Sequence, residues 1–175
     1  MTQYTRAEEE SANRIVYEYG DSILRLCLLY LHDEQLAQDA AQDSLIKICG
    51  KLSQFQGKSS EKTWIMHIVA NTCRDYYRSS WYRHIDADVM FDKLEIPDDI
   101  VEEERKQWEK DCEVTRAVAN LPRSLREVIL LRFYQNMSIN EISQALRCSV
   151  SAVNKRLRKA KEKLKPALWG VYFDE

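Results

Sequence analysis

The C-terminal fifth of the chain carries side chains that could bind a nucleic acid. After Ser149, small polar residues come first, and lysines and arginines follow as far as Lys165. Hydroxyl and amide groups can hydrogen-bond to base edges, while Lys and Arg neutralise phosphates. The candidate residues are Ser151, Ala152, Asn154, Lys155, Arg158 and Lys159. The chemistry that they suggest is non-covalent recognition of DNA. The alternative is a solvated basic helix in a bundle.

A second set suited to nucleic acid lies in the N-terminal half. From Trp64 to Arg78, an aromatic ring, an imidazole, an amide and two guanidinium groups recur at helical spacing. Aromatic rings can stack on bases, and guanidinium groups can hold phosphates. The preceding loop contains Gly57 and serines, which would let its backbone approach a nucleotide. The candidates are Phe55, Gln56, Lys58, Ser59, Trp64, His67, Asn71, Arg74 and Arg78. On this pattern alone, core aromatics with a charged outer face are an equal alternative.

A third set is suited to binding protein. Asp39, Gln42, Asp43 and Ile46 recur at i, i+3, i+4 and i+7, which places them on one face of a helix. An acidic and amide stripe beside an isolated isoleucine suits a docking surface. The alternative is an ordinary solvated face.

No set of residues in the sequence indicates catalysis, a metal or a cofactor. Five cysteines stand far apart without a CxxC pair, and the three histidines have no metal-ligand spacing with them. Core thiols are the simpler interpretation. There is no nucleophile–base pair and no glycine-rich phosphate loop, so we do not expect an enzyme.

The elements that must position these residues are helices. Apolar residues recur at three- and four-residue spacings almost throughout, and four Gly and three Pro in 175 residues leave little room for a turn-rich β fold. We therefore expect an all-α fold. No apolar run approaches about 18 residues, and the polar, acidic N-terminus is unlike a signal peptide. We expect a cytoplasmic protein without membrane insertion.

The C-terminal candidates lie on the second helix of a predicted helix-turn-helix. Ser138 and Glu141 match a capping box, and Ser149 can cap a second helix after the turn. Apolar residues then form one predicted buried seam, namely Val150, Val153, Leu157, Ala160 and Leu164. Two short capped helices with a tight turn are typical of a DNA-binding helix-turn-helix, with the basic second helix as the recognition helix.

Charge divides the chain into two parts. Residues 86–104 hold nine acids and one base, whereas residues 121–165 hold eleven bases and three acids. An acidic run with few aromatics is typical of a linker. We therefore expect two small helical domains, 1–85 and 105–175, joined by an acidic linker at 86–104. The alternative is one continuous helical bundle with an acidic surface loop.

Three stretches of the sequence resemble a known family. DAAQDSLIKI, FQGKSSEKTWIMHIVANTCRDYYR and LPRSLREVILLRFYQNMSINEISQALRCSVSAVNKRLRKAKEKL occur in this order. They resemble segments of bacterial sigma factors of the sigma-70 class, in the compact extracytoplasmic-function (ECF) group. The resemblance implies a sigma-2-like domain before the linker and a sigma-4-like helix-turn-helix domain after it. It also implies a transcription initiation factor rather than the rival stand-alone helix-turn-helix regulator.

The family resemblance assigns a role to each candidate set. It implies that Asp39, Gln42 and Asp43, with Ile46 beside them, dock on the β′ clamp helices of core RNA polymerase. The set from Phe55 to Arg78 would read the −10 promoter element, and the recognition helix the −35 element. The expected partners are core polymerase, including its β flap, promoter DNA and an anti-sigma factor.

Two positions depart from the family's pattern. His67 stands where the family usually has Arg. Arg147 replaces the usual glycine of the helix-turn-helix turn, and a left-handed backbone there would cost on the order of 1 kcal/mol.

Overall fold

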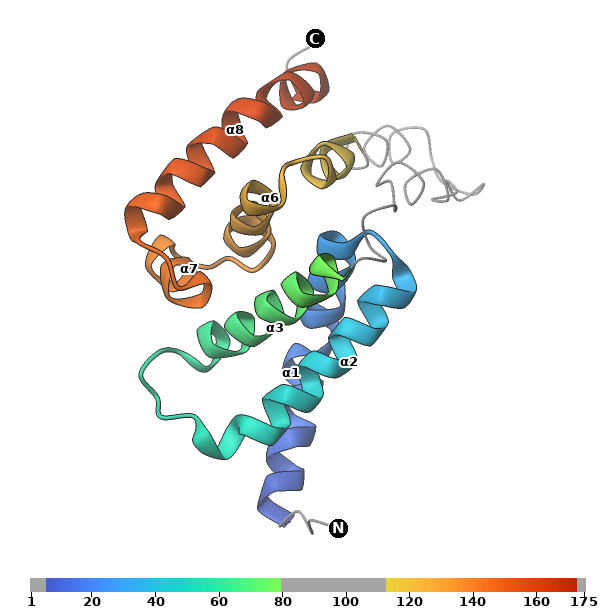
Figure 1. Ribbon diagram of the computed structural model, residues 1–175, viewed down its shortest axis with the longest axis vertical. Coiled ribbons are helices and arrows are strands. Elements are labelled where there is room, and N and C mark those ends of the chain that lie inside the picture. Colours follow the sequence, from blue (N-terminus) through green and yellow to red (C-terminus); the bar gives the residue numbers. More distant parts are fainter. Residues whose placement is uncertain (1–5, 80–112, 173–175) are drawn as a thin grey trace.

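The computed structural model describes residues 6–79 and 113–172, and every regular element within these two ranges is a helix (Figure 1). The first range contains α1 (Arg6–Leu31), α2 (Glu34–Lys51), the 3-10 helix η1 (Leu52–Gln54) and α3 (Glu61–Arg78). In the second range, a helical segment at 113–119 precedes α6 (Arg123–Ile129), the π-helix η3 (Leu130–Tyr134), α7 (Ile139–Leu146) and α8 (Val150–Tyr172). The predicted all-α fold is confirmed.

Local sequence signals define the helices of the N-terminal domain. The carboxylate of Asp33 caps α2, and the hydroxyl of Ser60 caps α3. His32, between α1 and α2, has a left-handed φ of 56°, which reverses the chain direction. Arg14 of α1 forms a two-pronged ion pair with Glu61 in the first turn of α3, at 2.6 and 3.0 Å. This pair joins α1 to α3 across the domain.

The helix-turn-helix forms as the sequence predicts. The Ser138 hydroxyl accepts a hydrogen bond from the Glu141 N–H at 3.2 Å, and the Glu141 carboxylate accepts one from the Ser138 N–H at 2.9 Å. Ser149 caps α8 by accepting a hydrogen bond from the Ala152 N–H at 3.2 Å. Arg147 ends α7 in the left-handed conformation, with φ 49° and ψ 49°. The conformation that favours glycine is therefore adopted by an arginine in this chain.

The predicted seam of α8 is correct except at its first residue. Val153, Leu157, Ala160 and Leu164 are buried, but Val150 is 41% exposed. Val150 is the first residue of α8, at the end of that helix. The helical period predicts burial only where a neighbouring helix is present to cover it.

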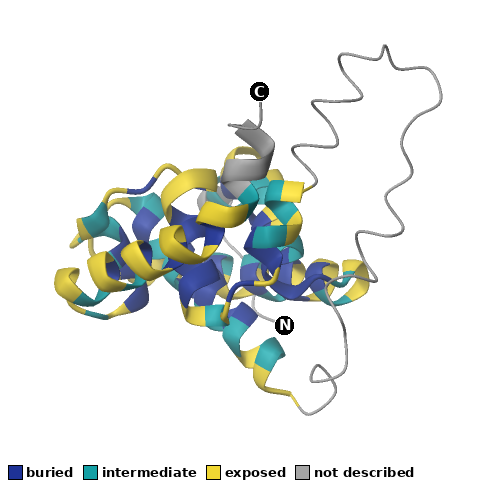
Figure 2. Ribbon diagram, turned by 90° about the horizontal axis from the view of Figure 1, so that it is seen from above, coloured by how far each residue is buried: buried dark blue, intermediate teal, exposed yellow. Residues whose placement is uncertain are grey.

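The two helical domains are in contact. α3 packs along α7, and α1 meets α6 and η3. Buried residues from both domains form one continuous hydrophobic core (Figure 2). The expectation of two helical parts is correct, but they do not stand apart. The predicted linker at 86–104, and both of its boundaries, lie outside the described residues.

The four described cysteines are free, and Cys27 and Cys73 are buried core thiols with their sulfurs 3.6 Å apart. Within the described ranges, no group of His, Cys, Asp and Glu residues could hold a metal ion. None of the helices described here is both long and apolar enough to cross a membrane.

Candidate nucleic-acid and polymerase interfaces

The recognition helix α8 presents an open polar face. Ser151, Lys155 and Lys159 are exposed along it, as are Asn154 and Arg158. Ala152 is half-buried. Arg158 lies 3.9 Å from Glu162, but both side chains are about two-thirds exposed, so this ion pair is weak. The predicted DNA-binding side chains of α8 are therefore available to a ligand.

The predicted −10 residues of α3 are arranged differently. We call Trp64, His67, Asn71, Arg74 and Arg78 the α3 stripe. Only Arg78 of this stripe is exposed, and the other four members are half-buried. His67 and Arg74 of this stripe hydrogen-bond to the C-terminal domain, so the stripe is not an open face like that of α8.

Arg74 is at the centre of a polar network that joins the two domains. Its Nε donates to the Glu127 carboxylate of α6 at 2.8 Å, and the side chains of these residues are 19% and 4% exposed. The Tyr30 hydroxyl also donates to Glu127, at 3.1 Å. Burial works against the charged form of Arg74, but the hydrogen bond and charge of Glu127 outweigh it and raise the pKa of the guanidinium. The Asn71 carboxamide accepts from Arg74 at 3.0 Å.

His67 continues this network to the end of α7. Its Nδ1 lies 2.5 Å from the Ala145 carbonyl oxygen, and its Nε2 lies 3.0 Å from the Asn71 amide nitrogen. Because the carbonyl can only accept, Nδ1 donates and the neutral ring accepts from Asn71 at Nε2. Burial lowers the pKa of His67, with the charges of Arg147 and Arg74 acting in the same direction. A neutral imidazole fits both hydrogen bonds.

The loop before α3 stays open. Gln56 and Lys58 are exposed, and Ser59 is half-buried. Gly57 has a φ of +67°, a conformation that glycine adopts without strain. The Phe55 and Trp64 rings pack with their centroids 5.2 Å apart. The loop therefore offers polar groups to solvent beside a packed aromatic pair.

The predicted docking face of α2 is open except at Asp43, which is half-buried. Asp39, Gln42, Asp43 and Ile46, which we call the α2 stripe, lie opposite the buried face formed by the alanines of α2. Ile46, a large apolar side chain, is 62% exposed. The Tyr76 hydroxyl donates to Asp43 at 2.9 Å, and burial together with this carboxylate raises the pKa of Tyr76 to about 12. This hydrogen bond fixes Asp43 on the surface.

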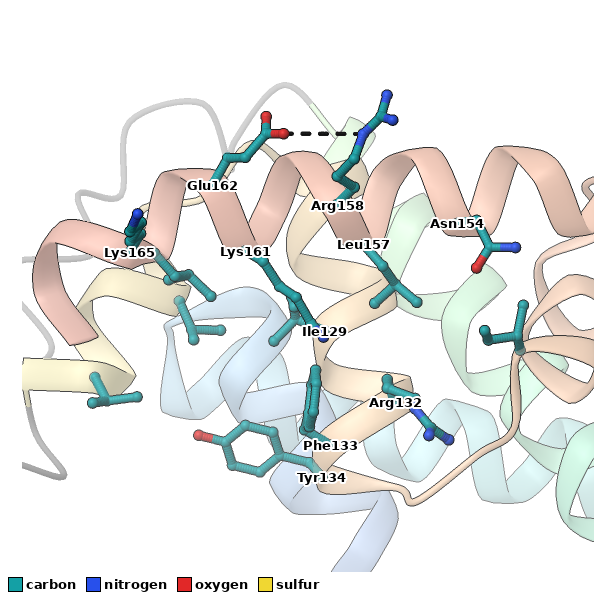
Figure 3. Close-up of a pocket in the computed structure, with 14 residues that line it drawn as sticks. Ile129, Arg132, Phe133, Tyr134, Asn154, Leu157, Arg158, Lys161, Glu162 and Lys165 are labelled. Carbon is teal, nitrogen blue, oxygen red and sulfur yellow. Dashed lines mark ion pairs between the residues drawn. The ribbon is translucent and has the colours of Figure 1, made fainter. Parts of the chain in front are cut away.

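Sequence reasoning missed a groove in the C-terminal domain. It lies between α8 and the α6–η3 segment and has a volume of about 1020 Å³ (Figure 3). Ile129 and Leu157 line its apolar part, and Phe133 and Tyr134 of η3 remain about half exposed. The π-helical turn carries these two rings, and such turns are common at functional sites. The rim is basic and includes Arg132, Arg158, Lys161 and Lys165.

Comparisons with known proteins identify both domains. The Sigma-70 region 2 family matches residues 15–83, and the Sigma-70 region 4 family matches residues 113–164. The RNA polymerase sigma-H factor of Pseudomonas aeruginosa is 30% identical, over 93% of this chain and 89% of its own. The ECF RNA polymerase sigma factor SigX of Bacillus subtilis is 29% identical, over 91% and 88%.

Solved structures share the fold. CnrH in complex with the cytosolic domain of CnrY aligns with a TM-score of 0.68 at 21% identity, over 93% of this chain and 90% of that one. RpoE from Bartonella quintana, in complex with the anti-sigma factor NepR, gives a TM-score of 0.67 at 18% identity, over 93% and 98%.

The chain therefore belongs to the sigma-70 class of bacterial RNA polymerase sigma factors. Within this class it is a member of the extracytoplasmic-function group. It is a transcription initiation factor that directs RNA polymerase to promoters, and not an enzyme. The rival interpretation as a stand-alone helix-turn-helix regulator is not favoured, because the N-terminal half matches region 2.

Proposed function

We propose that this sigma factor docks on the β′ clamp helices of core polymerase through the α2 stripe. The exposed Ile46 is the observation that carries this assignment, because a large apolar side chain at 62% exposure gains from being covered by a partner. The carboxylates of Asp39 and Asp43 beside it suit basic groups on that partner. The hydrogen bond from Tyr76 holds one of these carboxylates in place.

The two DNA-reading surfaces follow from this placement. The outer face of α8 would enter the major groove of the −35 element, with its hydroxyl, amide and basic groups on base edges and phosphates. The α3 stripe and the loop from Phe55 to Ser59 would capture unstacked bases of the −10 element. Unstacking costs a few kcal/mol for each base, which stacking and hydrogen bonds must offset.

The groove between α8 and η3 is the surface that we assign to the β flap. Its apolar lining and exposed aromatic rings suit one face of an amphipathic helix, and its basic rim suits acidic residues beside that face. The same chemistry would suit an anti-sigma factor. RpoE from Bartonella quintana, which has the same fold, was solved in complex with the anti-sigma factor NepR, and CnrH was solved in complex with the cytosolic domain of CnrY. Because its polymerase target is cytoplasmic, we place the protein there as well.

The test is run-off transcription with core polymerase on a promoter library, followed by sequencing of the transcript starts. The wild-type chain should select promoters with two elements at a fixed spacing. The double variant Asp39→Lys/Asp43→Lys should lose co-purification with β′. Asp21→Lys/Glu34→Lys is the matched control, because it makes the same charge change at exposed sites outside the stripe. Equal loss in both variants would show a general charge effect and reject the α2 assignment.

A further inference from the structure

The turn between α7 and α8 holds an arginine in a backbone conformation that arginine rarely adopts. Arg147 has φ 49° and ψ 49°, the left-handed region in which a Cβ lies too close to the following carbonyl oxygen. Glycine would adopt this conformation without strain, so an arginine here costs stability. Residues in strained conformations cluster at functional sites, and they persist where the surrounding structure holds the backbone in place.

Hydrogen bonds hold this turn in place. The Arg147 N–H donates to the Gln144 carbonyl oxygen at 3.3 Å. The Cys148 N–H donates to the Ser143 carbonyl oxygen at 3.1 Å, and the Ser143 hydroxyl donates to the Cys148 carbonyl oxygen at 2.6 Å. Ser149 then caps α8. The backbone of Arg147 is therefore fixed relative to the first turn of the recognition helix.

No contact within the described part of the chain explains the arginine side chain. The described ranges contain three non-glycine residues with a positive φ, namely His32, Asn136 and Arg147. Histidine and asparagine adopt this region more readily than most residues, and His32 is also buried and hydrogen-bonded to Arg126. Arg147 is exposed, and its guanidinium forms no hydrogen bond or ion pair with any residue that the structure describes. Its cation is therefore available to a ligand.

Arg147 lies beside the surface that we assign to the −35 element. It precedes the Ser149 cap by two residues, and Ser151 is exposed in the first turn of α8. The N-terminal residues of a recognition helix contact base edges, so the chain just before them lies near the phosphates that border the groove. Asn140 and Gln144 of α7 are exposed at i and i+4, and Arg147 follows at i+7 on the same face. Amide and guanidinium groups are typical phosphate contacts.

We propose that Arg147 binds a backbone phosphate of the −35 DNA, as a contact outside the recognition helix. The guanidinium donates charge-assisted hydrogen bonds to the phosphate oxygens, and this contact positions α8 without reading a base. Binding of DNA thus offsets the backbone strain that the free protein carries. The inference rests on the proposed function, since it takes α8 to enter the major groove of the −35 element.

The main experiment uses the complex of the full chain with core polymerase and fluorescently labelled duplex promoters that the wild-type chain selects from the library. Binding is measured between about 50 and 200 mM salt. Arg147→Ala should weaken binding on the order of fivefold and reduce the slope of log K against log salt by about 1. The loss should be equal for promoters with different −35 sequences. Arg147→Lys keeps the cation and the Cβ, so it should recover most of the affinity and of the slope.

Arg147→Gly distinguishes a phosphate contact from a structural role. Because it relieves the backbone strain, this variant should raise the urea-unfolding midpoint of the free chain and still bind promoters as weakly as Arg147→Ala does. A residue that only maintained the fold would lose binding only together with stability. Lys163→Ala is the matched control, because it removes one exposed positive charge from the same domain. It should change promoter binding by less than about twofold.

Lys155→Ala, on the exposed face of α8, separates this inference from the proposed function. If Lys155→Ala weakens promoter binding while the alanine and glycine variants of Arg147 leave affinity and salt slope unchanged, the inference is wrong and the assignment of α8 stands. A loss confined to one base of the −35 element, or a loss equal to that of Lys163→Ala, would also overturn the phosphate contact. If the wild-type chain selects no promoter, or if none of these variants weakens binding, the proposed role of α8 is rejected together with the inference.

Discussion

The two helices that we assign to DNA differ in what lies against them. On α8, Lys155, Lys159 and their neighbours extend into solvent. On α3, Arg74 and His67 are engaged by Glu127 and by the Ala145 carbonyl. A set of nucleic-acid-binding residues therefore does not reveal by itself whether the surface is free. Predictions for each surface test this difference, beginning with the largest expected effect.

The first prediction makes the same kind of substitution on both helices. Arg74→Met leaves the buried Glu127 carboxylate without its cation, so we expect the free energy of unfolding to fall by about 3 kcal/mol. Lys155→Met removes an exposed, solvated cation and should change it by less than about 0.5 kcal/mol. Urea denaturation followed by circular dichroism measures both. The double variant Arg74→Met/Glu127→Leu should recover most of the loss, and failure to recover would contradict the ion-pair explanation.

The second prediction concerns promoter binding by the complex of this protein with core polymerase. Arg158→Ala or Lys155→Ala should weaken binding to promoters that depend on the −35 element, by about 1–3 kcal/mol where the residue contacts a base. Substituting a residue that contacts a base should relax the preference for that base at one promoter position. Substituting a residue that contacts a phosphate should weaken binding to all promoter sequences alike. Lys163→Ala, an exposed lysine two turns beyond Lys155, is the control. If both test variants bound these promoters as the wild type does, the exposed face of α8 would have no role in reading DNA.

The variant Asn71→Ala should impair transcription from promoters whose two DNA strands are fully paired. If Asn71 acts in opening, premelted templates should restore the activity of this variant, because the unstacking cost has been removed. If it instead recognises a base, preference within the −10 element should change on both kinds of template. Wild-type behaviour on both would reject the reading role of Asn71.

The third prediction concerns the turn before α8. Arg147→Gly should raise the free energy of unfolding by about 1 kcal/mol, because glycine adopts the left-handed conformation without steric strain. Thermal denaturation at two scan rates would measure the gain. Arg147→Ala is the control, since alanine removes the charge but keeps the Cβ. An equal gain with alanine would attribute the effect to charge rather than to backbone strain.

The smallest expected effect is a dependence on pH. His32 accepts a hydrogen bond from Arg126 of α6, and burial together with this charge lowers the pKa of His32 to about 3. The unfolded chain binds a proton near pH 6.5 and the folded chain does not, so stability is complete above this pH and falls below it. Between about pH 7.5 and 6.0 the loss from His32 should be just under about 1 kcal/mol.

The pH dependence should belong to the contact between the domains. His67 has a lowered pKa for the same reason, burial, and therefore acts in the same direction. The variants His32→Gln and His67→Gln should each reduce the change in the urea-unfolding midpoint between these pH values. The double variant should reduce this change further. An unchanged slope in the double variant would place the titrating groups elsewhere in the chain.

The sequence predicted the local features of the candidate sites correctly. The capping box of Ser138 and Glu141 involves residues three positions apart, and hydrogen bonds over such short spans can be anticipated from residue types alone. The exposed Ile46 also followed from the helical period, since the alanines on the opposite face of α2 had to be buried. The family resemblance supplied the order of the domains, and the comparisons confirmed it.

By itself, then, the sequence determined which helices form, how they are capped and which of their faces carry polar groups. Only the tertiary structure decided that Arg74 meets Glu127, because these residues are 53 positions apart and no local pattern links them. It also decided that Glu141 serves two helices, that Val150 remains exposed and that η3 and α8 enclose a groove. The physical reason is that caps and helical faces depend on neighbours within a few residues. The partner of a face depends instead on which helices pack together, and α7 packs against α3.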